Sequence, residues 1–505
     1  MVAALVLWAL GCGGEPASGP AVQLVYGARG EGEIEPCGCP ENPRGGLSRR
    51  HTALEALRAA GPTVVVDGGA SLNRLGPVPD LPGALEQRQL KGALIAERFG
   101  AAGLDAMALS ADDWRLGSTF VREQVASHGL PVVAANLSCE EGPPWPGGRV
   151  VRAGSLTIGV VGVTGGEVEG CEISPAGPAL KQAVAALGEV DLVVGLVPFS
   201  ELAELAPASD VGIDVVIDGR DRAPSAGAEK RGAALFVSAG TEGRSLGVLS
   251  LHPEGGAGPW RVAGAAAQLE RDLASWVAQR ESTEARLAEA SAEDRPTFER
   301  QLAAFDRAIV ETESRLAGAS EAKAGRWLEI GQRDLDAEVP DHPETKARVE
   351  AVKDRVAMAG GEDPRKFVPR RVAEGPYLGG EGCVACHREQ PLQWSTTAHA
   401  RAWQGLVAVN RALDLECWSC HVTGAGAEGG PDSPRASAGF RDVQCEACHG
   451  PGRAHAEAPS GPEAGPIVRD PGEARCRTCH DGVRDEGRFD AATYRAKVVH
   501  PSVDP

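Results

Sequence analysis

The sequence predicts a multidomain protein with an α/β domain first, a helical hairpin next and a mostly helical or irregular domain last. Three observations support this division. Residues 22–258 alternate short apolar runs with helical segments, residues 262–360 are rich in Ala, Glu, Arg and Leu, and residues 371–505 hold four Cys-x-x-Cys-His pentapeptides. A length of 505 residues suits two or three domains. The formal charge of −19 argues against nucleic acid or an anionic membrane surface as the main partner.

The first residues are typical of an export signal. Val2–Leu10 is apolar, and the segment Ala9–Cys12 resembles a bacterial lipobox, in which the chain is cut before a cysteine that then carries the lipid. The apolar run is too short to span a bilayer. We therefore expect residues 1–12 to be a lipoprotein signal with Cys12 as the lipidated residue, and residues 13–21 to be a tether. An ordinary cleaved signal is the alternative.

The α/β domain, residues 22–258, is predicted from the order of its apolar runs. The runs typical of strands are Val22–Tyr26, Thr63–Val66, Ala106–Leu109, Pro131–Ala135, Leu156–Val163, Asp191–Val197, Asp214–Ile217, Ala233–Ser238 and Leu246–Leu251. The helical stretches are Thr52–Ala60, Leu85–Phe99 and Ala179–Leu187. This is enough apolar sequence for a full core.

In this order the runs resemble the metallophosphatase domain of bacterial 5′-nucleotidases, part of the calcineurin-like superfamily. Asp105–Asp113 is similar to that family's DAxxxGNHE segment, and Gly212–Arg222 to its gIDxxxxGHxH segment. The resemblance implies an α/β sandwich whose metal pair makes a hydroxide and holds the phosphate. It also implies that the ligands are lost, because the family's ligand positions hold Ala70, Ala111, Asp112, Pro198, Arg220 and Arg222. Methyl groups and cations do not replace ligands for divalent ions, so we expect an inactive metallophosphatase-like domain.

Polar groups near this degenerate centre allow two interpretations each. Besides Cys12, the cysteines outside the pentapeptides are Cys37, Cys39, Cys139 and Cys171. In an exported protein these favour one or two disulfides, and a soft-metal site is the alternative. The arginines at 49, 50, 220 and 222 are interpreted as a solvated basic edge, and an anion site is the alternative.

Residues 262–360 predict a helical hairpin or coiled-coil segment. Two seams step alternately by four and three residues; they are Leu269, Leu273, Trp276, Arg280, Thr283 and Leu287, then Phe298, Leu302, Phe305, Ile309, Thr312 and Leu316. Ser291–Pro296 supplies the turn. A third helix carries Val349, Val352 and Val356 on one face. We interpret the segment as a structural spacer or a docking hairpin.

The four pentapeptides are Cys383–His387, Cys417–His421, Cys445–His449 and Cys476–His480. Two thiols at this spacing can each bond one vinyl group of a porphyrin, and the adjacent histidine then lies under the iron. Zinc sites also use Cys-x-x-Cys, but zinc does not require a histidine directly after each pair. The sequence therefore predicts four covalent c-type hemes. The attachment residues are Cys383, Cys386, Cys417, Cys420, Cys445, Cys448, Cys476 and Cys479, and the proximal ligands are His387, His421, His449 and His480.

Residues 371–505 resemble the tetraheme cytochrome c family that takes electrons from hydroxylamine oxidation. The likeness is densest over Gly439–His455, and Trp394–Ala400 matches as well. The resemblance implies that His399 and His455 are distal ligands, usually to a heme other than their neighbour's, and His500 is the remaining candidate. Three distal histidines for four irons leave one heme five-coordinate or with a foreign ligand. By analogy we expect an open face at the heme of Cys417, Cys420 and His421. Bis-histidine ligation should keep the other potentials low.

The leading functional interpretation is electron transfer. We expect a periplasmic, lipid-anchored cytochrome at the outer membrane that exchanges electrons with redox partner proteins in the periplasm or membrane, with no nucleic-acid partner. The α/β domain would act as a scaffold or dock a partner. One alternative is a heme oxidoreductase acting on a small nitrogen or oxygen species at the five-coordinate heme. Another is a metal-dependent phosphohydrolase or 5′-nucleotidase. No catalytic residue is assigned.

Overall fold

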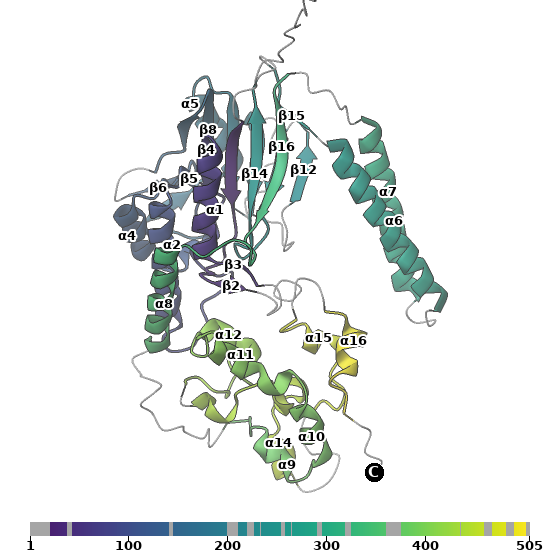
Figure 1. The fold of residues 1–505 in the computed structure, drawn as a ribbon. Coiled ribbons are helices and arrows are strands. Elements are labelled where there is room, and N and C mark those ends of the chain that lie inside the picture. Colours follow the sequence, from purple (N-terminus) through teal and green to yellow (C-terminus); the bar gives the residue numbers. More distant parts are fainter. Residues whose placement is uncertain are drawn as a thin grey trace, which may run out of the picture. The chain divides into compact units, whose positions relative to one another are not determined.

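A computed structural model (Figure 1) describes most of the chain. The described residues are 21–37, 43–140, 145–198, 211–219, 227–232, 234–253, 258–263, 265–289, 295–318, 325–359, 375–434, 436–458, 467–480 and 489–500. The predicted signal and the lipidation site Cys12 lie outside them. Among the described helices, none combines the length and the apolar character needed to cross a bilayer. The chain divides into two compact units, one made chiefly of residues 249–331 and the other of most of the remainder.

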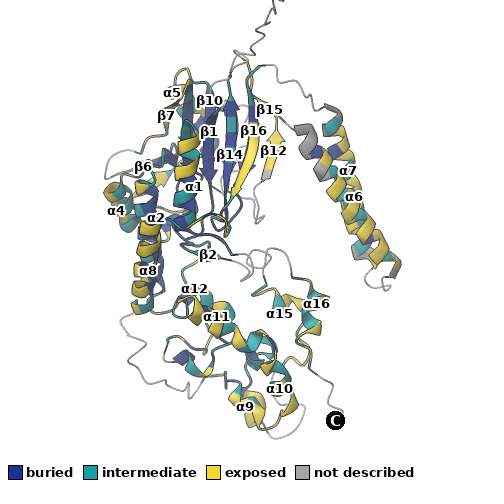
Figure 2. Cartoon of the chain, in the orientation of Figure 1, coloured by how far each residue is buried: buried dark blue, intermediate teal, exposed yellow. Residues whose placement is uncertain are grey.

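One six-stranded sheet has the strand order β12-β13-β11-β10-β8-β7. Its strands are β7 (Gly148–Ala153), β8 (Leu156–Gly162), β10 (Leu192–Val197), β11 (Val215–Asp218), β12 (Gly227–Arg231) and β13 (Ala234–Ser238). The four inner strands run parallel, and the edge strands β7 and β12 pair antiparallel. Every residue of β10 is buried (Figure 2), as expected for a parallel strand covered on both faces. The predicted α/β class is confirmed.

The other six-stranded sheet has the order β15-β16-β14-β1-β4-β5. Its strands are β1 (Val22–Gly27), β4 (Thr63–Asp67), β5 (Ala106–Met107), β14 (Ser245–His252), β15 (Arg261–Val262) and β16 (Trp327–Asp334). The run expected as a strand at Pro131–Ala135 makes only an isolated bridge, between Val132 and Met107. Two short ribbons complete the strands: β2 (Pro36–Cys37) with β3 (Arg44–Gly45), and β6 (Leu137–Cys139) with β9 (Cys171–Ile173).

The helices of the α/β domain are α1 (Leu47–Ala60), α2 (Ala84–Ala101), α3 (Ala111–Trp114), α4 (Ser118–His128) and α5 (Ala176–Ala186). Helix α2 supplies Leu94, Ile95 and Phe99 to a buried apolar cluster. Polar side chains nearer the start of the helix are buried on the same face.

The segment expected to be a helical hairpin is more varied than its sequence indicated. Helices α6 (Ala265–Glu289) and α7 (Arg295–Gly318) pack together as predicted, with Trp276 and Phe305 at a ring-centroid distance of 6.1 Å. The strands β15 and β16, however, flank this hairpin and belong to the sheet. Helix α8 (Pro343–Met358) buries its three valines in the same apolar cluster as α2. Sheet and core residues thus follow residue 258 in the sequence.

From residue 375 onward, in the C-terminal domain, the described residues form short helices and irregular segments, as predicted. The helices are α9 (Glu381–Val384), α10 (Glu389–Ser395), α11 (Ala402–Ala408), α12 (Leu415–His421), α13 (Cys445–His449), α14 (Arg453–Glu457), α15 (Glu473–Cys476) and α16 (Ala491–Ala496). The apolar cluster of this domain is small and is built on Tyr377, Trp403, Leu415, Trp418 and Phe440.

Candidate functional site

Two of the four pentapeptides lie on short helices: α12 carries Cys417 to His421, and α13 carries Cys445 to His449. Residues three apart are neighbours on one side of a helical turn, so each of these two pairs of thiols faces the same way. Cys383 lies in α9 and Cys476 is the last residue of α15, and the second thiol of each of these motifs follows in a turn. The eight thiols of the pentapeptides form no disulfide in the structure. All of them are thus available for covalent attachment of a cofactor.

Six histidines of the C-terminal domain face one another in three pairs. The pairs are His387 with His455 at a ring-centroid distance of 6.3 Å, His399 with His480 at 6.3 Å, and His449 with His500 at 6.1 Å. Each pair joins one pentapeptide histidine to one of the expected distal candidates. Imidazoles bound on opposite sides of one ion, with metal–nitrogen bonds of about 2 Å, would have ring centroids roughly 6 Å apart. The spacing leaves room for one metal ion between the two rings of each pair.

Hydrogen bonds fix the orientation of several of these rings. The Nδ1 atoms of His421 and His449 lie 2.7 Å from the carbonyl oxygens of Ala402 and Val468, and Nδ1 of His500 lies 2.9 Å from Oε1 of Gln393. A carbonyl oxygen only accepts, so Nδ1 carries the hydrogen and Nε2 keeps its lone pair for a metal.

Burial also favours the uncharged form of these rings. It lowers the pKa of His399, His421 and His500 below the ordinary value for histidine. A neutral imidazole is the form that binds metal. The donor set as a whole, with thiol pairs beside oriented neutral histidines, fits covalently attached heme.

His421 differs from the other pentapeptide histidines. Within the described residues it takes part in no facing pair of rings. Its neighbour Trp418 is fully buried and packs near Trp403, with ring centroids 6.4 Å apart. We call Cys417–His421 the second heme motif.

The predicted degenerate metal centre contains an ion pair. The Asp67 carboxylate, at the start of the segment 67–70, lies 3.6 Å from the Arg50 guanidinium and accepts hydrogen bonds from Ser71 Oγ and Gly69 N. Arg50 is buried, so the expectation that it belongs to a solvated basic edge was wrong. Asp112 accepts a hydrogen bond from the backbone of Gly76. Arg220 and Arg222 lie outside the described residues.

A histidine and carboxylate cluster joins α1 to α8 elsewhere in the domain. Its members are His51, Glu55 and His342. Among the described residues, these three form a group whose ligand atoms are close enough to one another to hold a metal ion. The two rings are stacked, with centroids 3.9 Å apart and planes at 6°. Stacked rings direct their in-plane lone pairs side by side and not at one point. Moreover, Nδ1 of His342 accepts the Thr345 N–H, which leaves the hydrogen on Nε2. We therefore interpret this cluster as a structural contact that stabilises the packing of the two helices.

The cysteines of the α/β domain confirm the disulfide interpretation for one pair. Cys139 and Cys171 stand opposite each other on β6 and β9 and form a disulfide. A metal site built from all four thiols is thereby excluded. Cys39 lies outside the described residues.

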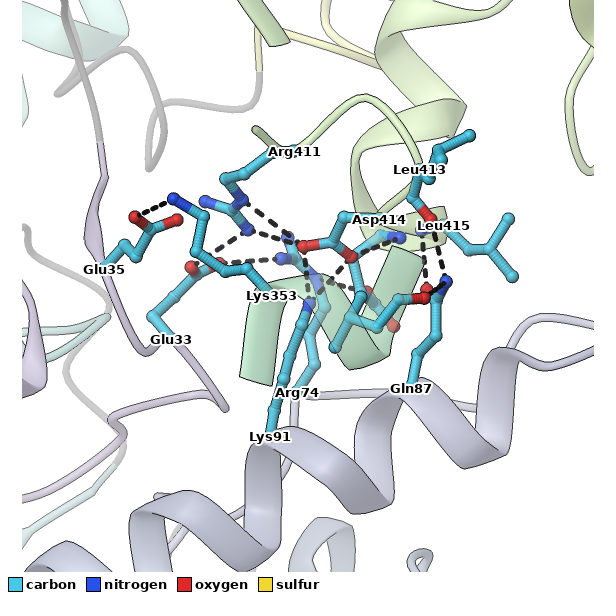
Figure 3. A network of polar contacts seen from close by, with 12 residues as sticks. Glu33, Glu35, Arg74, Gln87, Lys91, Lys353, Arg411, Leu413, Asp414 and Leu415 are labelled. Carbon is cyan, nitrogen blue, oxygen red and sulfur yellow. Dashed lines mark hydrogen bonds and ion pairs between the residues drawn. The ribbon is translucent and has the colours of Figure 1, made fainter. Parts of the chain in front are cut away.

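The C-terminal domain contacts the α/β domain through a buried polar network (Figure 3). From α2, Lys91 Nζ lies 2.6 Å from Asp414 Oδ2, and Gln87 bonds the backbone on both sides of Asp414. Arg411 also reaches Glu33, on the loop after β1, at 3.3 Å. These residues were not predicted from the sequence. The available signal is that Gln87 and Lys91 stand at helical spacing on the same face of α2 as Leu94 and Ile95, which the sequence places in the core.

Comparison with known proteins gives a match to one sequence family, a related protein and similar solved structures. Residues 382–450 match the sequence profile of the family described as "Cytochrome c554 and c-prime". Cytochrome c-554 of Nitrosomonas europaea is 34% identical over an alignment of 73 residues that covers 12% of this chain and 31% of that protein. The present chain thus matches about a third of the length of this relative.

Solved structures similar to this chain include two proteins of Thermus thermophilus. The 5′-nucleotidase precursor has a TM-score of 0.46 at 17% identity, covering 77% of this chain and 68% of that one. The sulfate thiohydrolase SoxB, solved in complex with glycerol, has a TM-score of 0.45 at 16% identity, covering 74% of this chain and 69% of that one.

Proposed function

We propose that this protein is an exported multiheme c-type cytochrome that transfers electrons. The observation that carries the proposal is the set of three facing histidine pairs, each of which contains one pentapeptide histidine. The matches to cytochrome c554 support the same function over residues 382–450. Heme attached to such motifs supplies one-electron redox chemistry.

The chain's own residues would divide the work as follows. The eight pentapeptide cysteines would attach four hemes, and the four pentapeptide histidines would bind their irons. His399, His455 and His500 would supply a second histidine to three of the irons. The carbonyl oxygens of Ala402 and Val468 accept from Nδ1 of His421 and His449, so that Nε2 of each ring keeps a lone pair for a metal.

In this proposal the α/β domain is an inactive, metallophosphatase-like scaffold. The Arg50 guanidinium forms an ion pair with the carboxylate of Asp67. The described residues show no cluster of metal ligands around that carboxylate. The buried network on α2 supports a scaffold role, because it binds the segment directly ahead of the second heme motif.

We also propose a location and redox partners for the protein. We infer from Cys12 that a lipid anchors the protein at the outer membrane, facing the periplasm, where redox proteins donate and accept its electrons. The net charge of −19 favours partners with basic surfaces.

A second candidate function rests on His421. Because no histidine ring faces it among the described residues, a heme held there would have an open face. A small nitrogen or oxygen species could then bind and react at that heme. Paramagnetic resonance decides between the two functions, since a spectrum with only low-spin iron would remove this second candidate.

The test of the main proposal is a mass spectrum of the mature protein, produced alongside a functioning cytochrome c maturation apparatus. We expect four porphyrin additions and one diacylglycerol, together with a Soret band that shifts on reduction. A Cys476→Ser/Cys479→Ser variant should carry one porphyrin fewer. A colourless protein without porphyrin would overturn the proposal.

A further inference from the structure

We propose that the α/β domain sets the redox potential of the heme attached at the second heme motif, through the side chains that α2 directs at residues 411–416. This inference rests on the proposed function, because it requires the hemes to be present. The contacts lie within one compact unit of the chain. Gln87, Arg88 and Lys91 are all buried, although each is polar.

Gln87 clamps the backbone at the start of α12. Its Nε2 donates to the carbonyl of Leu413 at 2.7 Å, and its Oε1 accepts the N–H of Leu415 at 2.8 Å (Figure 3). Leu415 is the first residue of α12, and the first N–H groups of a helix lack partners within it. One amide from α2 therefore fixes the peptide on both sides of Asp414 and completes the beginning of the helix that carries Cys417, Cys420 and His421.

Lys91 fixes the side chain of Asp414, the residue between the two peptides that Gln87 binds. Its ammonium lies 2.7 and 2.6 Å from the two oxygens of Asp414. Asp414 is the N-cap of α12, where its side chain accepts the N–H of Glu416. Although burial opposes ionisation, Lys91 and Arg411 hold the pKa of Asp414 below its ordinary value. A stable anion thus sits at the start of α12, paired with a cation from the α/β domain.

Three further ion pairs join this segment to the α/β domain. Glu416, the residue before Cys417, lies 2.5 Å from Arg88 Nε and 3.1 Å from Arg74 Nε. Arg74 follows β4, and the loop after β1 supplies Glu33 to Arg411. Both loops thus hold the chain directly ahead of the second heme motif.

The buried setting makes each of these charges effective. Water screens such a network poorly, so a charge removed from it changes the local potential more than a surface charge does. Loss of a cation disfavours the added electron and lowers the redox potential, whereas loss of an anion raises it. The second heme motif is also the one whose histidine has no facing histidine among the described residues. Its heme would therefore depend most on support from outside the C-terminal domain.

The experiment compares Lys91→Met and Asp414→Asn in the full-length holoprotein by spectroelectrochemical titration. Asparagine still caps a helix, and Met retains most of the lysine stem. The heme of the second motif is identified by its absence from a Cys417→Ser/Cys420→Ser variant. We expect Lys91→Met to lower the potential of that heme and Asp414→Asn to raise it, with the other three unchanged. Lys346→Met is the control, because Lys346 is exposed on α8 and pairs with Asp341.

Opposite shifts confined to one heme are not produced by a general loss of structure. If both variants keep four hemes and that potential stays where it is in the wild type, or if all four potentials move together, the inference is wrong. Should Lys91→Met not fold, Lys91→Gln takes its place with the same expected direction. A wild-type protein without heme would instead refute the proposed function.

Discussion

The guanidinium of Arg50 lies 3.6 Å from the carboxylate of Asp67, and both side chains are buried in the α/β domain. Arg50 also lies over the ring of Phe99, with its Cζ 4.7 Å from the ring centroid. Packing on one side and charge on the other hold the cation in place. The carboxylate that begins the segment 67–70 is thus already neutralised by the chain itself.

The first prediction concerns phosphatase activity. With 5′-AMP and either manganese or cobalt, the purified protein should release no phosphate above background. The reason is that Arg50 forms an ion pair with Asp67 and that the neighbouring ligand positions hold Ala70 and Ala111. Arg50→Ala should be equally inactive, since it frees one carboxylate but restores no other ligand. Metal-dependent phosphate release by the wild type would contradict the assignment.

The second prediction concerns ligation of the irons. His500→Ala should convert one heme from low spin to high spin, because it removes the ring that faces His449 at 6.1 Å. The measurement is the high-spin signal in paramagnetic resonance, integrated against total heme. His128→Ala, on α4 of the α/β domain, is the matched control and should leave the spectrum unchanged. A high-spin signal that is the same in both variants would disprove the pairing.

The third prediction concerns the disulfide between Cys139 and Cys171. The replacement of both cysteines by serine should lower the free energy of unfolding by about 3 to 4 kcal/mol, if the bond acts mainly by restricting the unfolded chain. The midpoint of urea denaturation measures the change. Reduction of the wild-type protein should reproduce it, and a variant as stable as the wild type would show that the bond adds nothing.

The fourth prediction concerns pH. Burial, reinforced by the stacked ring of His342, lowers the pKa of His51, while Glu55 and Glu344 oppose the shift and Arg98 adds to it. A lowered pKa in the folded state means that His51 stabilises the fold above the ordinary histidine pKa of about 6.5 and that this stability is lost as the pH falls below it.

The comparison of His51→Asn with the wild type isolates this effect, because every other histidine is present in both proteins. Between pH 7 and pH 5 the wild type should lose more stability than the variant in thermal unfolding. Parallel curves for the two proteins would show that His51 does not titrate in this range.

The parts of the fold that the sequence predicted are those whose residues carry a local signal. Buried strands such as β8 and β10 are continuous apolar runs and were found nearly to the residue. Strand β16 was missed, because its side chains are mostly exposed and its sequence therefore lacks an apolar run. Helix α8 was expected from its valines, but no local pattern showed that α2 would cover them.

The candidate site divides in the same way. The spacing of a thiol pair and its histidine is a property of five consecutive residues, so the attachment motifs are visible in the sequence. Which distal histidine faces which motif depends on the path of the whole C-terminal domain. The contact between Lys91 and Asp414 joins parts of the chain that are remote in sequence, and neither residue is unusual in its own surroundings. Such a pair emerges only when the tertiary structure is known.

The hairpin of α6 and α7 leaves the sheet after β15 and rejoins it at β16, and these two strands are parallel neighbours, with Arg261 opposite Trp327. Its departure and return points are consequently side by side. An insertion whose two ends are adjacent can be shortened, lengthened or replaced by another sequence without changing the path of the chain on either side. Among relatives of this protein, the hairpin is thus where variation in length should concentrate.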